Sequence, residues 1–206
     1  MTNPTKPFTL AAVGVRVRTG RAVLLALSGP ADAPRLVTRA EVDLTDPKVV
    51  DSKQPFHVGL ELTGVRGERA VEHACRAARR AGAASLSGEF EHTETRGVRL
   101  AAATVVSDSA TDPASIGNLH MRAHASEGQL FRDICCDAAN AFGLVTERAL
   151  AKNLRDTLAQ ALETDSKRID SVLAAIGTDA GRPWRADEKL AAMGAWLALR
   201  TAARAT

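Results

Sequence analysis

The chain has 206 residues, of which 45% are hydrophobic and 25% charged, and a formal net charge of +3. This composition indicates neither a disordered chain nor a membrane protein, and the length predicts one folded domain over residues 1–206. With five Phe, two Trp and no Tyr, the sequence lacks the aromatic platform on which many proteins stack single-stranded bases. No apolar run reaches the roughly 20 residues that cross a bilayer, and no signal-peptide core opens the chain. We therefore expect a cytoplasmic protein that does not contact a membrane.

The first part of the chain predicts antiparallel strands. Residues 8–17 and 22–29 are apolar stretches of strand length on either side of the turn signal RTGR, which indicates a hairpin. Residues 35–44 alternate apolar and polar side chains, as a strand with one solvated face does. After a proline-containing loop, residues 57–62 predict a further short strand.

From Gly67 onward the apolar side chains recur with the period of a helix. The polar residues 87–97 predict a connecting segment that leads to a buried central strand at residues 98–108. The rest of the chain predicts helices, at residues 119–142, 146–162, 165–176 and 184–203. We accordingly divide the domain into an α/β core at 1–143 and a helical C-terminal portion at 144–206.

Acidic residues occupy two positions that this element order makes informative. Asp108 ends the predicted central strand, and the segment RADEKLAAM places Asp187 and Glu188 in the first turn of the last helix. This arrangement resembles the ribonuclease H-like superfamily, and within it the RuvC-resolvase-like branch. The resemblance implies an α/β fold with a mixed sheet opened by three antiparallel strands and flanked by helices. It also implies a carboxylate cluster that holds two divalent metals.

The first strand departs from that family pattern. The segment AAVGVRVRTG carries Arg16 and Arg18 where the family has an acidic residue. Losing this carboxylate removes the ligand that bridges both metals, so the resemblance does not extend to a complete two-metal centre. Guanidinium groups suit phosphate by their planar, bidentate geometry, which makes Arg16, Arg18 and Arg122 candidate phosphate-binding residues. The alternative is that they belong to a solvated surface.

The stretch GNLHMRAHASEGQLFR carries His120, His124 and Glu127. If the helix begins before His120, these side chains lie at i, i+4 and i+7 and share one face. Two imidazoles and a carboxylate can then supply three metal ligands. If Ser126 and Gln129 instead form a capping box, the helix begins at Ser126 and both histidines lie in a loop. The pattern is compatible with a metal site, a polar site without metal, or structural histidines.

Two hypotheses follow for the function. In the first, the protein binds or hydrolyses nucleic acid, with Mg, Mn or Zn activating water at a site formed by Asp108, His120, His124, Glu127 and Asp187. In the second, it is a catalytically inactive binding or assembly module of the same fold. A homodimer is the partner expected there, because leucines recur every four residues between 150 and 162.

Overall fold

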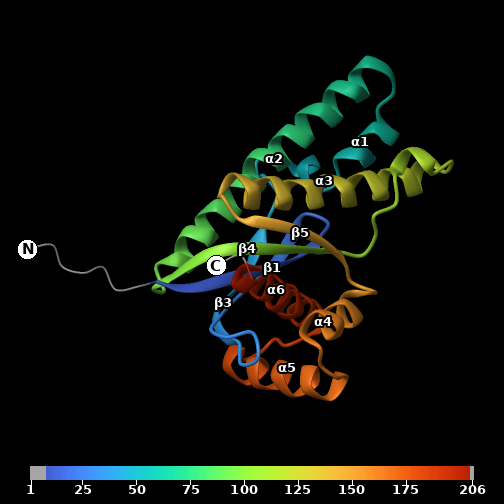
Figure 1. Ribbon diagram of the computed structural model, residues 1–206. Helices are drawn as coiled ribbons and strands as arrows, with labels where there is room; N and C mark the ends of the chain where they lie inside the picture. The colour runs from blue at the N-terminus through green and yellow to red at the C-terminus, as the bar shows by residue number, and fades with distance from the viewer. Residues whose placement is uncertain (1–7, 205–206) are drawn as a thin grey trace, which may run out of the picture.

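The computed structural model describes residues 8–204, which form a five-stranded mixed sheet with helices on both faces (Figure 1). The spatial order of the strands is β3-β2-β1-β4-β5. The first three strands pair antiparallel, whereas β4 lies parallel to both β1 and β5. The strands are β1 (Thr9–Arg18), β2 (Arg21–Ser28), β3 (Arg35–Asp43), β4 (Val98–Ser107) and β5 (Val145–Leu150).

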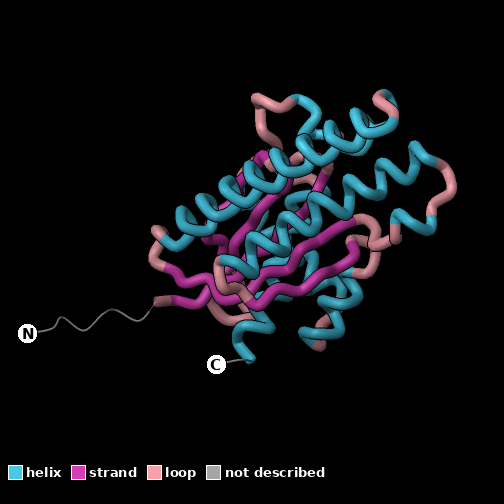
Figure 2. The backbone as a smooth tube through the Cα atoms, turned by 90° about the horizontal axis from the view of Figure 1, so that it is seen from above, coloured by secondary structure: helices cyan, strands magenta, loops and turns pink. Residues whose placement is uncertain are grey.

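The helices form one layer on each face of the sheet (Figures 1 and 2). On one face lie α2 (Gly64–Glu94) and α3 (Leu119–Ala141), with the short α1 (Pro55–Glu61) packed against both. On the other lie α4 (Leu154–Leu162), α5 (Ser166–Ala180) and α6 (Ala186–Arg204). Short 3₁₀ turns at Val50–Lys53 and Pro113–Ser115 complete the elements. No helix within residues 8–204 has the length and apolarity that a membrane span requires.

The side chains of β1 alternate between the two layers, because successive residues of a strand point to opposite faces. Val13 and Val15 enter the core beneath α2 and α3, whereas Ala12 enters the core beneath α6. Gly14 points the same way as Ala12, and a Cβ at this position would lie 1.9 Å from the Ala191 carbonyl oxygen. The missing side chain therefore lets α6 lie directly on β1, the middle strand of the sheet.

The predicted α/β class and the mixed sheet opened by three antiparallel strands are confirmed. The hairpin, the third strand and the central strand all occur close to their predicted bounds. The predicted strand at 57–62 is wrong, because Pro55 occupies the first turn of the helix α1 there. The predicted connection at 87–97 is also largely wrong. That stretch continues α2 to Glu94 and buries Phe90 against the sheet.

The C-terminal portion is less helical than predicted. Residues 145–150 form β5, which extends the sheet beside β4, and the helix predicted from 146 begins only at Leu154. The predicted division at residue 143 therefore separates one strand from its sheet.

The start of α3 decides between the two interpretations of the histidine stretch. Asn118 caps this helix through a hydrogen bond from the Met121 amide to its side chain, so α3 begins before His120 and the start at Ser126 is wrong.

Candidate functional site

Two arginines of β1, Arg16 and Arg18, hydrogen-bond the side chains of both Asp108 and Asp187. The Arg16 guanidinium donates to Asp108 over 2.6 Å and to Asp187 over 3.1 Å. Arg18 donates to the same two carboxylates, over 2.7 Å to Asp108 and 2.8 Å to Asp187. Each carboxylate thus meets both guanidinium groups. We call these four residues the arginine–aspartate network.

The alternation of the strands explains how this network forms. Arg16 and Arg18 are two and four residues beyond Gly14, so they point toward α6, whose first turn carries Asp187. Val106 enters the core beneath α6, and Asp108 follows it by two residues, directly after the end of β4. β1 and β4 are parallel, so their carboxyl ends bring the arginines and Asp108 to one edge of the sheet.

The network shifts the pKa of Asp187 and of Arg18. Partial burial by itself would raise the pKa of Asp187, but the hydrogen bonds from Arg18 and Arg16 outweigh it and hold that pKa below its usual value of 3.8. The hydrogen bond to Asp187 likewise raises the pKa of Arg18. Both shifts favour the charged forms of Asp187 and Arg18.

These residues do not fit a two-metal centre. Two adjacent divalent cations require several carboxylate or other oxygen ligands that are free to coordinate. Here both carboxylates already accept guanidinium hydrogen bonds, and β1 supplies Arg16 in place of an acid. Glu188, the acidic neighbour of Asp187, is buried and caps α6 by accepting from the Arg185 amide. Arg16 itself is only 1% exposed, and its guanidinium meets the carboxylates of Asp108 and Asp187.

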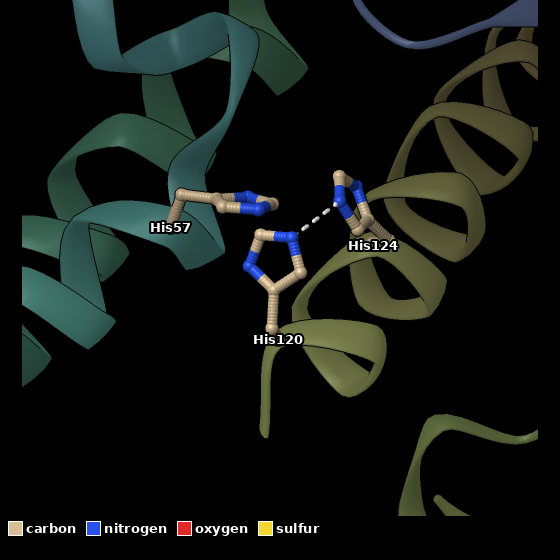
Figure 3. Close-up of side chains that lie close together, drawn as sticks. All are labelled: His57, His120 and His124. Atoms are coloured by element: carbon tan, nitrogen blue, oxygen red, sulfur yellow. Dashed lines mark hydrogen bonds between the residues drawn. The ribbon is translucent and has the colours of Figure 1, made fainter. Parts of the chain in front are cut away.

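The predicted histidines form a second group with a residue that the sequence did not suggest. His120 and His124 lie on α3, and His57 approaches them from α1 (Figure 3). The three ring centroids are 4.5 to 4.9 Å apart. One nitrogen of each ring lies within 4.8 Å of the corresponding nitrogens of the other two, close enough to share a metal ion. We call His57, His120 and His124 the histidine cluster.

Glu127 lies beneath the histidine cluster and is fully buried. Its Oε1 accepts a hydrogen bond of 2.7 Å from His57 Nδ1, and its Oε2 lies 3.8 Å from His124 Nδ1. The predicted set of His120, His124 and Glu127 does share one side of α3. However, Glu127 lies beside Nδ1 of His57 and Nδ1 of His124. The three side chains that could share a metal ion are therefore His57, His120 and His124, with His57 in place of Glu127 as the third ligand.

A cleft with a volume of about 370 Å³ borders both groups. Asp108 and Arg18 line it from the sheet, and His124 lines it from α3. Arg132 also lines it; its guanidinium donates to the Ser109 carbonyl, while its buried Nε has no hydrogen-bond partner among residues 8–204. Arg122, in the first turn of α3, donates from its Nε to the carbonyl oxygen of Ile116, which lines the cleft. Of the predicted site residues, Asp108, Arg18 and His124 line this cleft, and each belongs to one of the two groups that border it.

Comparison with solved structures identifies the architecture. The structure of Thermus thermophilus RuvC superposes with a TM-score of 0.55, covering 95% of this chain and 97% of that one at 12% sequence identity. The fold is RuvC-like. The same TM-score and identity are found for T. thermophilus RuvC in complex with a Holliday junction substrate, with 96% of that chain covered. No protein-family model and no curated protein matches the sequence. The RuvC-like ribonuclease H fold predicted from the element order is therefore confirmed as a fold.

Proposed function

We propose that the protein binds nucleic acid in the cleft and does not cleave it at the sheet edge. The observation that carries this proposal is the pairing of Asp108 and Asp187 with Arg16 and Arg18. This pairing supports binding of nucleic acid. It opposes hydrolysis by two metal ions bound to Asp108 and Asp187, because both carboxylates already contact arginines.

Electrostatics supports the binding part of the proposal. A bare carboxylate pair repels a phosphodiester backbone unless cations lie between them. Arg16 and Arg18 supply that neutralisation permanently, and Arg132 adds a further positive charge to the cleft lining. The RuvC-like fold and the RuvC structure that contains a Holliday junction substrate make branched DNA the first ligand to test. The overall charge of +3 is compatible with an anionic partner.

Arg122 provides a direct test, because it lies beside the cleft on α3 and is only partly exposed. Replacement by Gln keeps a side chain that can donate to Ile116 but removes the positive charge. Arg96→Gln is the matched control. Arg96 precedes the first residue of β4, whereas Asp108 follows its last, so the control lies at the far end of that strand.

The measurement is fluorescence anisotropy with a four-way junction, a duplex and a single strand at several salt concentrations. We expect Arg122→Gln to weaken binding several-fold. The slope of log affinity against log salt should fall by about 0.9 for each phosphate that the variant no longer neutralises. Arg96→Gln should leave both quantities unchanged. Denaturing gels of the same mixtures with Mg²⁺ or Mn²⁺ should show intact strands.

Two outcomes oppose the proposal in different ways. Cleavage that disappears in Asp108→Asn would show a metal-dependent nuclease and contradict the absence of hydrolysis. No binding to any nucleic acid at low salt, together with dimers in sedimentation, would favour the assembly module instead.

A further inference from the structure

The histidine cluster has the geometry of a metal centre. The Nε2 atoms of His120 and His124 lie 3.1 Å apart. Two nitrogens bound at about 2.0–2.1 Å to one tetrahedral ion are separated by nearly the same distance. The rings of His57, His120 and His124 converge on one small volume between α1 and α3 (Figure 3). Of the five histidines in the chain, these three meet here, while His73 and His92 lie exposed on α2.

Glu127 completes the arrangement that orients a metal-binding histidine. Nδ1 of His57 lies 2.7 Å from Glu127 Oε1, and an ionised carboxylate only accepts hydrogen bonds, so with an ionised Glu127 the proton of this bond is on Nδ1. In a neutral imidazole this leaves the lone pair on Nε2, which is the tautomer that binds a metal ion. His57 Nε2 is buried and has no hydrogen-bond partner among residues 8–204. The carboxylate thus orients His57 so that its Nε2 lone pair is available to a cation, and no described protein group occupies that nitrogen.

The burial of Glu127 points the same way. Its Oε2 is also buried without a hydrogen-bond partner in the described chain, and its side chain is 0% exposed. A buried carboxylate is costly unless positive charge lies nearby. His124 Nδ1 lies 3.8 Å from that oxygen. A divalent cation held by the histidine cluster would supply the compensating charge.

We propose that His57, His120 and His124 bind one divalent transition-metal ion, with Zn²⁺ as the best match. An all-imidazole donor set suits Zn²⁺ and disfavours Mg²⁺, which prefers oxygen ligands. Three protein ligands leave the fourth position of a tetrahedral ion for water or a substrate atom. His120 and His124 are exposed, so solvent reaches that position, and His124 also lines the cleft. Glu127 is a positioning residue that acts through His57.

The metal ion would also add a link between α1 and α3, which already pack against each other. His57 is the one member of the cluster on α1, and the other two lie on α3. A shared ion therefore ties a seven-residue helix, too short to be stable alone, to the 23-residue α3. We expect Zn²⁺ to slow hydrogen exchange of the α1 amides. Unchanged exchange at saturating Zn²⁺ would overturn this attachment.

Metal titration of the chelator-treated protein tests the site directly. We expect one Zn²⁺ per chain by calorimetry, a rise in the melting temperature, and tetrahedral Co²⁺ absorption without a thiolate charge-transfer band. His120→Ala and His124→Ala should each weaken Zn²⁺ binding by more than about 100-fold, and Glu127→Gln by about 10- to 100-fold. Because His120 and His124 are exposed, their variants should keep the circular dichroism spectrum of the parent.

His73→Ala and His92→Ala are matched controls, since both remove an exposed histidine of α2. They should bind Zn²⁺ with the parent affinity. Equal affinity in His120→Ala and the parent, a thiolate band with Co²⁺, or no binding by the folded parent would each overturn the site. The experiment uses no nucleic acid, so its failure is distinct from failure of the proposed function.

Discussion

Arg16 reaches Asp108 across the edge of the sheet, with 2.6 Å between its guanidinium nitrogen and the carboxylate oxygen. The arginine is 1% exposed and the aspartate side chain 60% exposed, so the pair joins the protein interior to the cleft. Through this contact Asp108 belongs to a network in which two arginines pair with two aspartates. Its consequences can be measured in stability, pH dependence and cation binding.

Replacing Arg16 should destabilise the fold. Arg16→Met removes the buried cation and leaves Asp187, which is 18% exposed, with one guanidinium instead of two. We expect the free energy of unfolding to fall by about 1.5–3 kcal/mol, because the hydrogen bonds from the buried guanidinium to Asp187 and Asp108 are lost while Arg18 still pairs with both carboxylates. Urea denaturation checks this. Arg21→Gln, which breaks the exposed pair with Glu41 in the same hairpin, should cost less than about 1 kcal/mol. Equal losses in the two variants would contradict a special role for Arg16.

The network should also add an acid-dependent term to stability. The pKa of Asp187 in the folded protein lies below the usual value of 3.8, so its contribution is fully present above pH 3.8 and is lost as the pH falls through the folded pKa. The difference in unfolding free energy between the parent and Asp187→Asn should therefore be constant from pH 7 to about pH 5 and shrink below about pH 4. A difference that grows on acidification would show the opposite linkage.

The cap of α3 should be worth a measurable part of the stability. Asn118→Ala removes the side-chain oxygen that accepts from the Met121 amide, and we expect a loss of about 1 kcal/mol. Asn153 precedes α4 in the corresponding position but makes no capping hydrogen bond through its side chain. Asn153→Ala should therefore change stability by only a few tenths of a kcal/mol. Thermal and urea unfolding of the two variants give the comparison, and equal losses would mean that the Asn118 cap is unimportant.

Much of the fold could be predicted because the strongest patterns are local. Turn residues between apolar runs marked the hairpin, and the acidic first turn marked the start of α6. β5 escaped prediction because VTERAL leads into leucines spaced four apart, and its place beside β4 depends on contacts with a distant strand. The segment around His57 forms only seven residues of helix, and over so short a stretch the spacing of apolar residues does not distinguish a strand from a helix.

The site could be predicted only in part for a related reason. His120, His124 and Glu127 lie close in sequence on one helix, so their spacing alone brings them together once the helix starts early. His57 joins them through packing of α1 on α3, which no local pattern encodes. The alternation of β1 did contain a usable signal, since it places Arg16 on the face of Gly14 and toward the last helix.

Cation binding at the sheet edge is the most direct test of the arginine–aspartate network. Mn²⁺ can be titrated into ¹⁵N-labelled His124→Ala protein, because this paramagnetic ion broadens the amide signals of residues near its binding site and the substitution removes a ligand of the histidine cluster, which borders the same cleft. If the guanidinium groups occupy the carboxylates, the signals of Asp108 and Asp187 should stay sharp while Mn²⁺ is added. Selective, saturable broadening at these two residues would contradict the network and restore a metal-binding edge.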